Sequence, residues 1–566
     1  MTKKSPPTAA ALQALYKSAL DALGAGRFEE SIALLEKVLA AAPSNGEIHN
    51  NLGTAHWKCR RLSKAEEHYA KAVKLSPDNA LAHNNYGALL LELLRFDDAE
   101  KHFRRAYELK PDHPSVIHHR GLMLHRRGDF AGAEKSLRDS LALRPANAQG
   151  WALLLQLLEM TNRLDDAAQA LARAKALFPD SVPIATVQAR LLRRSGKAAE
   201  AIPELERLAP AITGTPPEGV AFFSELGQLY DLDNRPDAAF AAFQRANDIQ
   251  AAQPGTNAID KKAYTAITGR LTQELTPALV KAFPAPVPDE RRAPVFLVGF
   301  PRSGTTLLNQ ILGSHPGVYA AEERAGVAAM GEYFTRAFGT TLKPGQVLQS
   351  GAEIWGDPAY PAAIPQLKTD DILAMRRAFY REHNADAQIG GKLFVDKMPV
   401  NMMHAAFISA VFPEAKFILA LRHPCDCVLS CFMQAFEMNA AMARFLDITD
   451  AAHFYDEIFS VWEHTTTVLP LKAHHIRYED VVAGFRPAVE NLLAFLGLPW
   501  DDGVLAYDKT AQAKERINTA SYHQVTQKIY TRASGRWRRY RKYLEPVTGI
   551  LAPHARRYGY SMDTDE

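Results

Sequence analysis

Cysteine is scarce in this sequence, with four residues among 566. Cys425, Cys427 and Cys431 lie close together, and Cys59 stands apart from them. Four cysteines are too few for a disulfide framework, and three neighbouring thiols do not complete a tetrahedral metal site. We therefore expect core or loop thiols, no metal, and a reducing compartment.

The sequence also lacks an excess of one charge and any long apolar run. Lys+Arg 66 against Asp+Glu 63 leave a net charge of +3, which argues against a general nucleic-acid binder. No apolar stretch reaches the length of about eighteen residues that a membrane-spanning helix needs. Pro6, Pro7, Gln13 and Lys17 interrupt any apolar segment of signal-peptide length. We expect a cytoplasmic protein with no membrane span and no nucleic-acid partner.

A period of 34 residues runs through the first part of the chain. The residues that keep this step are Pro43, Pro77, Pro111, Pro145 and Pro179; Gly53, Gly87 and Gly121; Phe28, Leu62, Phe96, Phe130 and Leu164; and Ala65, Ala99, Ala133 and Ala167. Small residues let two antiparallel helices approach closely, the aromatic or leucine residue opens the second helix, and proline ends it. The period therefore predicts stacked helical hairpins.

This pattern resembles tetratricopeptide repeats and covers residues 10–252. The resemblance implies an all-α right-handed solenoid with a concave face that binds peptides, so we expect it to recruit an acceptor substrate or a peptide partner. We interpret its histidines as solvated surface, because we find no metal-ligand spacing that recurs with the repeat. Residues 253–293, which contain AFPAPVPDERRAP, predict a short helix and a proline-rich linker.

The last domain, residues 294–560, opens with VFLVGFPRSGTTLLNQIL. An apolar strand, a glycine-containing turn and a helix N-terminus form a cradle for an anion. The two glycines have the spacing of GxxxxGK[ST], but Thr305 stands where an NTPase has its lysine. Arg302, the hydroxyls of Thr305 and Thr306 and the backbone amides can still hold a terminal anionic group.

A second phosphate-binding pair is predicted further along the chain. KFILALRHPCDCVLS predicts a buried strand, a turn and a helix, with Arg422 and Ser430 eight positions apart. Both residues can donate to a phosphate. Separately from this pair, four residues stand just beyond short apolar runs and a fifth closes its own run: Arg302, Glu323, Lys397 and Arg422, and then Tyr478. Because ligands bind at the carboxyl ends of strands in a parallel α/β sheet, we expect all five residues at one edge.

GFPRSGTTLL resembles the 5′-phosphosulfate loop of sulfotransferases that use 3′-phosphoadenylyl sulfate (PAPS), and the Arg422–Ser430 segment resembles their 3′-phosphate site. The chain resembles the bacterial sulfotransferases that carry tetratricopeptide repeats, and the tyrosylprotein sulfotransferases. The resemblance covers about residues 295–558. It implies a P-loop-like α/β domain with a parallel sheet, PAPS as the donor, and no metal.

The same resemblance assigns the other site residues. The loop residues assigned to the donor are Arg302, Ser303, Gly304, Thr305 and Thr306. FVDKMPVN implies that Lys397 reaches the sulfuryl group, and HIRYEDVV assigns Tyr478 to the nucleotide. The basic carboxy-terminal segment assigns Ser521 and Arg536 to phosphate or adenosine contacts. Arg302 and Lys397 can supply positive charge to the leaving phosphate oxygen.

Transfer to a hydroxyl or amine also needs a base. YAAEER resembles the segment that holds the catalytic glutamate of the tyrosylprotein enzymes, so Glu323 is the candidate base and Glu322 its rival. Those enzymes have an arginine two places after the glutamate, whereas this chain has Ala325. The acceptor thus stays open between peptide tyrosine, glycan, lipid and small molecule. His315, in HPGV, is expected to end the loop helix.

Two other functions stay open. The chain could be a nucleotide-dependent kinase or ATPase with a helical regulatory arm, which Thr305 and the Arg422–Ser430 pair disfavour. It could also be a tetratricopeptide scaffold that binds nucleotide without turnover, which the retention of Lys397 and Glu323 disfavours.

Overall fold

The computed structural model describes residues 8–289, 291–341, 351–384, 389–513 and 534–563. The chain forms two compact units. The repeat unit comprises Met1–Glu225 with Ala252–Ala258, and the sheet unit comprises Leu226–Ala251 with Ile259–Glu566. Leu226–Ala251 therefore groups with the sheet, although the period of the sequence continues through it. In the described ranges, none of the helices has the length and apolar character to cross a membrane.

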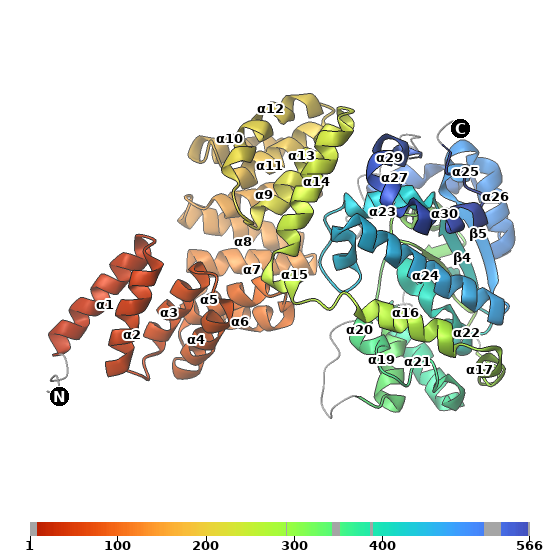
Figure 1. The fold of residues 1–566 in the computed structure, drawn as a ribbon, viewed down its shortest axis with the longest axis horizontal. Coiled ribbons are helices and arrows are strands. Elements are labelled where there is room, and N and C mark those ends of the chain that lie inside the picture. The colour runs from red at the N-terminus through yellow and green to blue at the C-terminus, as the bar shows by residue number, and fades with distance from the viewer. Residues whose placement is uncertain (1–7, 290, 342–350, 385–388, 514–533, 564–566) are drawn as a thin grey trace. The chain divides into compact units, whose positions relative to one another are not determined.

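The repeat unit consists of antiparallel helix pairs (Figure 1). Its helices are α1 (Ala9–Gly24), α2 (Phe28–Ala41), α3 (Gly46–Lys58), α4 (Leu62–Leu75), α5 (Ala80–Glu92), α6 (Phe96–Leu109), α7 (Pro114–Arg127), α8 (Phe130–Leu143), α9 (Ala148–Met160), α10 (Leu164–Leu177), α11 (Val182–Arg194), α12 (Ala198–Leu208) and α15 (Pro254–Asn257). From α2 to α10, the second helix of each pair begins at the aromatic or leucine residue of the period. The predicted all-α array is confirmed.

Close helix packing explains why small residues recur every 34 positions. A Cβ added to Gly53 would lie 2.7 Å from Cδ1 of Tyr69, and a Cβ on Gly87 would lie 2.8 Å from Cε1 of Phe103. The alanines of the period are fully buried. They are Ala65, Ala99, Ala133 and Ala167, each 0% exposed. A larger side chain at any of these positions would separate the two helices of its pair.

The paired histidines of the array correct our interpretation of solvated surface. The Nδ1 atoms of His49 and His68 lie 2.9 Å apart, and those of His83 and His102 also lie 2.9 Å apart, one repeat later. Burial, together with the neighbouring histidine, lowers the pKa of His68 and of His102 to about 4. No local motif reveals these pairs, because the two histidines of each pair lie 19 positions apart, on the two helices of a hairpin.

The sheet unit is built on a five-stranded parallel sheet of order β2-β3-β1-β4-β5. The strands are β1 (Val295–Gly299), β2 (Val318–Ala320), β3 (Leu393–Lys397), β4 (Lys416–Leu421) and β5 (Lys472–Arg477). In the register, Leu297 of β1 pairs with Lys397 of β3 and with Ile418 of β4. The loop after β1 is therefore flanked by the carboxyl ends of β3 and β4, as the parallel sheet predicts.

The α-helices of the sheet unit surround this sheet. They are α13 (Glu218–Leu232, which begins in the repeat unit), α14 (Pro236–Ala251), α16 (Ala263–Glu274), α17 (Pro277–Lys281), α18 (Thr305–Gly313), α19 (Gly326–Phe338), α20 (Gly351–Trp355), α21 (Thr369–Glu382), α22 (Ala405–Val411), α23 (Pro424–Phe432), α24 (Ile448–Val468), α25 (Tyr478–Ala483), α26 (Phe485–Leu496), α27 (Tyr507–Ala513), α29 (Arg541–Leu544) and α30 (Thr548–Arg557).

Apolar residues cover both faces of the sheet. Leu297 and Ile418 face the core that α18 and α26 complete. On the other face, the Phe296 ring lies 5.7 Å from Phe417, and Phe417 lies 6.0 Å from Trp462 of α24. Helices on both faces explain why the two central strands, β1 and β4, are nearly continuous apolar runs.

The segment predicted as a short helix and a proline-rich linker is anchored to the sheet unit. His464 Nε2 contacts the Leu275 carbonyl at 2.7 Å, and Arg270 donates to the Trp355 carbonyl at 3.0 Å. Helices α16 and α17 therefore belong to the packed unit.

Candidate active site

The turn between β1 and α18 has the backbone geometry of an anion cradle. Arg302 has φ +71° and Gly304 has φ +99°. A Cβ on Gly299 would lie 2.6 Å from the Ala420 carbonyl oxygen, so β4 approaches the turn as closely as backbone allows. The first N–H groups of α18 have no acceptor within their own helix. Ser303 Oγ is buried and has no hydrogen-bond partner among the described residues, so it can donate to a ligand.

Arg302, Arg422 and Ser430 meet at the carboxyl ends of β1 and β4. Arg302 Nε donates to Ser430 Oγ at 3.1 Å, and Arg422 Nη1 donates to the Arg302 carbonyl at 3.1 Å. The Arg422 guanidinium lies 5.3 Å from the centre of the Tyr478 ring. Burial lowers the pKa of Arg422, but Asp426 and neighbouring groups raise it further, so the pKa lies above its ordinary value. Two permanent positive charges thus lie beside the turn.

Tyr478 closes the cradle from the end of β5. The sequence predicts that Tyr478 closes an apolar run, but the strand ends at Arg477 and Tyr478 is the first residue of α25. A Cβ on Gly304 would lie 3.0 Å from the Tyr478 ring. The ring therefore covers Gly304, and any larger residue would be strained here by the positive φ and by the tight contact with the ring.

Lys397 and Glu323 form an ion pair on the neighbouring strand. Lys397 Nζ lies 2.6 Å from Glu323 Oε1, with side-chain exposures of 0% and 31%. Glu322 turns the other way, since its Oε1 accepts from Gln310 Nε2 of α18 at 3.2 Å. A buried ammonium needs a counter-charge, and Glu323 provides it. The pair puts a carboxylate at the edge of the sheet with one side still open to solvent.

The loop that carries Glu323 is held by residues that sequence reasoning missed. Asn309, fully buried on α18, donates to the Ala321 carbonyl at 3.2 Å. The fully buried ring of His383 lies against the start of α19, where a Cβ on Gly326 would be 2.3 Å from Nε2. His383 Nε2 also lies 3.2 Å from Asp396 Oδ1, next to Lys397. No local sequence signal identifies His383, because its partners are remote in the chain.

Arg536 lies in a different environment from the cradle residues. Its guanidinium pairs with Asp231 of α13, with Nη2 2.8 Å from Oδ2. Ser521 lies outside the described residues. The structure therefore brings Arg302, Arg422 and Ser430 together, with Lys397 on the next strand, and gives Arg536 a carboxylate partner instead.

His315 lies just after the end of α18, and the three neighbouring cysteines are buried. His315 Nε2 contacts the Pro499 carbonyl at 3.1 Å, and Nδ1 accepts from the Gly317 amide at 3.0 Å, just after α18 ends. Cys425, Cys427 and Cys431 are buried, and burial raises the pKa of the Cys425 thiol to about 12. Within the described part of the chain, no three His, Cys, Asp or Glu side chains could hold a metal ion.

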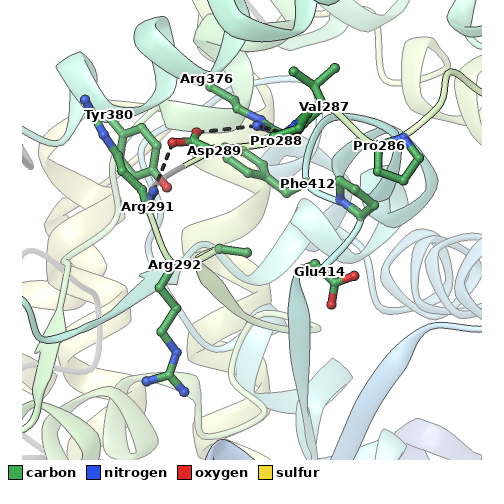
Figure 2. Close-up of a pocket in the computed structure, with 12 residues that line it drawn as sticks. Pro286, Val287, Pro288, Asp289, Arg291, Arg292, Arg376, Tyr380, Phe412 and Glu414 are labelled. Atoms are coloured by element: carbon green, nitrogen blue, oxygen red, sulfur yellow. Dashed lines mark hydrogen bonds and ion pairs between the residues drawn. The ribbon is translucent and has the colours of Figure 1, made fainter.

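A pocket of about 450 Å³ lies at the opposite, amino-terminal ends of β1 and β4 (Figure 2). The Arg376 guanidinium borders it and donates to the carbonyls of Val411 at 2.9 Å and Val287 at 3.0 Å. It also lies 3.4 Å from Asp289. Arg376 therefore fastens the segment before β1 to the sheet unit, and its Nε and Nη1 donors are engaged by the protein itself.

Known proteins resemble both parts of the chain. Residues 294–502 match the sulfotransferase family, and residues 16–80, 54–114, 124–191 and 186–254 match tetratricopeptide repeats. An uncharacterized protein of Aquifex aeolicus is 29% identical over 402 residues, which cover 70% of this chain and 49% of that protein. The chain thus spans about half the length of this relative.

Two further proteins are similar to this chain. Protein-tyrosine sulfotransferase 1 of Danio rerio is 23% identical over 282 residues, 47% of this chain and 72% of that protein. The sulfotransferase domain of the Synechococcus PCC 7002 olefin synthase aligns with a TM-score of 0.33 at 19% identity, covering 50% of this chain and 100% of that domain.

Proposed function

We propose that this chain, in which tetratricopeptide repeats precede a domain of the sulfotransferase family, moves the sulfuryl group of PAPS to a hydroxyl or amine acceptor. The observation that carries the proposal is the meeting of Arg302, Arg422 and Ser430 one strand away from the Lys397–Glu323 pair. The first group suits a donor with two phosphate groups, and the pair suits removal of a proton from the acceptor. We further propose that the reaction takes place in the cytoplasm, as the free thiols suggest.

Donor binding would use two sets of residues, one for the 5′-phosphosulfate and one for the 3′-phosphate. Arg302, Ser303 Oγ and the N–H groups at the start of α18 would hold the 5′-phosphosulfate. Arg422 and Ser430 would hold the 3′-phosphate, and Tyr478, which packs on Gly304, would contact the nucleotide. The buried Ser303 hydroxyl fits such a ligand, because it is a donor at the turn with no hydrogen-bond partner among the described residues.

The transfer breaks the bond between sulfur and the bridging phosphate oxygen and forms a bond from sulfur to the acceptor atom. Glu323 would take the acceptor proton. Lys397 and Arg302 would stabilise the charge on adenosine 3′,5′-bisphosphate, the leaving product. Once Glu323 is protonated, it no longer neutralises Lys397, so the full charge of the ammonium becomes available to the leaving oxygen. The ion pair therefore links proton removal to product stabilisation.

The repeat unit would recruit the acceptor or a peptide partner, since tetratricopeptide repeats generally bind proteins. Peptide tyrosine is one candidate acceptor, which the similarity to protein-tyrosine sulfotransferases supports. Ala325 marks a departure from that group near the candidate base. We therefore propose the acceptor class as a hydroxyl or amine and leave the natural acceptor to experiment.

The thermal shift of the full-length chain shows whether it binds a PAPS-type nucleotide or ATP. A ligand at 100 times its dissociation constant adds about 2.7 kcal/mol to the folded state, enough to raise the melting temperature by a few degrees. We expect adenosine 3′,5′-bisphosphate to produce this shift and ATP with magnesium not to. The reverse result would replace the sulfotransferase proposal with the kinase or ATPase.

Turnover separates an enzyme from a scaffold. Cell extract is incubated with the protein and PAPS that carries heavy sulfur, and labelled products are found by mass spectrometry. We expect a labelled product, and we expect it to form equally in EDTA because no step uses a metal. Binding of adenosine 3′,5′-bisphosphate without any labelled product would favour the scaffold.

A further inference from the structure

Asp231 on α13 is a buried carboxylate that holds residues 535–543, which we call the carboxy-terminal segment. It is 7% exposed and accepts from Arg536, from Arg539 Nη2 at 3.0 Å and from the Tyr540 hydroxyl at 2.6 Å. Three donors on five consecutive residues converge on one side chain. A carboxylate buried to this degree is stable only when such donors surround it.

The same carboxy-terminal segment is bound on its other side to α23. Asp426 accepts from the backbone amides of Gly535 and Trp537, each at 2.8 Å. The Trp537 ring stacks on His423 with centroids 4.7 Å apart. Asp426 lies on α23 between Arg422 and Ser430, the two residues assigned to the 3′-phosphate. The segment thus joins Asp231 to the helix of the donor site.

Helix α14 and the end of α13 contact the other end of α23 directly. Asn247 donates to the Phe432 carbonyl at 3.0 Å, and Gln228 donates to the Met433 carbonyl at 3.4 Å. The Phe240 ring stacks on Phe432 at 4.9 Å and on Tyr543 at 3.8 Å. The last carbonyls of a helix have no partner in their own helix, so these amides complete its end. Leu226–Ala251, which we call the last hairpin, therefore holds α23 and the carboxy-terminal segment together.

We propose that the last hairpin is part of the donor site and that Asp231 is a positioning residue for PAPS. The inference rests on the proposed function. Asp231 would act through Arg536 and the backbone of Gly535–Trp537, which in turn fix Asp426 and the start of α23. A helical hairpin that belongs to the repeats by sequence would thereby set the position of Arg422 and Ser430.

The test compares Asp231→Asn with Asp237→Asn in the full-length chain. Asp237 is a matched control, because it lies on the same hairpin and pairs with Lys542 of the same segment at 2.7 Å, but it is 67% exposed. Exposed ion pairs contribute little, whereas loss of a buried charged acceptor leaves its donors unpaired. Calorimetry with adenosine 3′,5′-bisphosphate, well below the melting temperature of each variant, gives the dissociation constant. Kinetics give KM for PAPS and kcat.

We expect Asp231→Asn to raise the dissociation constant and KM by about tenfold or more, with kcat changed by less than about threefold, since the chemistry at Glu323 is untouched. Asp237→Asn should stay within about twofold in all three quantities. Wild-type affinity in Asp231→Asn, or an equal loss in Asp237→Asn, would overturn the inference. A wild-type protein that fails to bind adenosine 3′,5′-bisphosphate would instead refute the proposed function.

Tyr540→Phe decides the matter if Asp231→Asn does not fold. It removes one hydroxyl donor from Asp231 and keeps the buried ring. We expect a rise of about threefold or more in the dissociation constant, from the loss of one hydrogen bond to a charged group. An unchanged dissociation constant in a folded Tyr540→Phe protein would overturn the inference.

Discussion

Lys397 and Glu323 are unequal partners in their ion pair, because Lys397 is fully buried and Glu323 is 31% exposed. Replacing Lys397 with methionine leaves a partly solvated carboxylate, which costs little. Replacing Glu323 with glutamine leaves a buried ammonium without its counter-charge, which lowers stability. The two variants should therefore resemble each other in catalysis and differ in stability.

We predict that Glu323→Gln and Lys397→Met each lower kcat by about 10² to 10⁴, while the dissociation constant of adenosine 3′,5′-bisphosphate stays within about threefold. Initial rates and calorimetry measure the two quantities, and a thermal melt checks folding. Glu322→Gln is the matched control and should retain activity, because its partner is Gln310. If Glu322→Gln is inactive and Glu323→Gln is normal, the base is Glu322 and not Glu323.

Arg422 remains charged at every accessible pH, since its pKa lies above its ordinary value. We predict that Arg422→Ala weakens binding of adenosine 3′,5′-bisphosphate by about 1.5 to 3 kcal/mol, the contribution of a hydrogen bond to a charged group. Ser430→Ala should have a smaller effect, because a hydroxyl carries no charge. Calorimetry is the measurement, and an unchanged affinity in Arg422→Ala would remove it from the donor site.

At the scale of elements, the histidine pairs make the repeat helices sensitive to acid. The pKa of His68 and of His102 lies at about 4 in the folded chain, below the ordinary value of 6.5. The unfolded chain therefore binds more protons between these values, and stability is lost as the pH falls from 6.5 towards 4. The pairs join α3 to α4 and α5 to α6.

We predict that the helical signal of the full-length chain melts at lower temperature at pH 4.5 than at pH 7, and that a His68→Gln, His102→Gln double variant reduces this difference. Circular dichroism at the two pH values measures it. A wild-type melting temperature that does not change over this range would contradict the prediction.

His554 makes the contact between α24 and α30 sensitive to alkali instead. It lies 2.8 Å from Asp456 and 3.2 Å from Glu463. Burial lowers the pKa of His554, but the two carboxylates raise it to about 9. The stability from this group is complete below about pH 6.5 and is lost as the pH rises through 9.

We predict that the sheet unit loses on the order of 3 kcal/mol at most between pH 6.5 and pH 10 through His554. Thermal melts of the wild type and of His554→Gln over this range measure the effect. The variant should be less stable at pH 6.5 and show a flatter pH profile. Parallel profiles for the two proteins would exclude His554 as the cause.

At the scale of the whole molecule, the last hairpin decides where the chain can be divided. A fragment of residues 253–566 loses Asp231, Asn247 and Phe240, and it exposes Phe432 and Tyr543. A fragment of residues 215–566 keeps all of these contacts. A cut after residue 252, where the repeat period ends in the sequence, therefore removes contacts that the proposed donor site needs.

We predict that residues 215–566 bind adenosine 3′,5′-bisphosphate within about threefold of the full-length chain, and that residues 253–566 bind at least about tenfold more weakly or aggregate. Fragment 215–566 should have a lower kcat/KM on the natural acceptor, because it lacks the repeats that we propose recruit this acceptor. Equal kcat/KM for this fragment and the full chain would argue against a role of α1–α12 in acceptor selection.

The sequence by itself determined the repeat helices, the parallel α/β class of the second domain and the anion cradle. The period determined where α2, α4, α6, α8 and α10 begin, because helix starts, helix ends and close-packed glycines are encoded within each repeat. The loop after β1 was equally predictable, since a strand, a glycine turn and a helix start are local features. Parallel strands then bring Arg302, Arg422 and Lys397 to one edge whatever else the chain does.

Only the tertiary structure decided which partner each buried charge has. Glu323 pairs with Lys397 across 74 positions, and Asp231 accepts from Arg539 and Tyr540 across more than 300. The last hairpin keeps the repeat pattern, with a Cβ on Gly227 only 2.8 Å from Phe243, yet it groups with the sheet. A periodic pattern specifies how two helices pack on each other but not what their outer faces contact. That choice depends on burying particular charges and rings against distant parts of the chain, which no local pattern records.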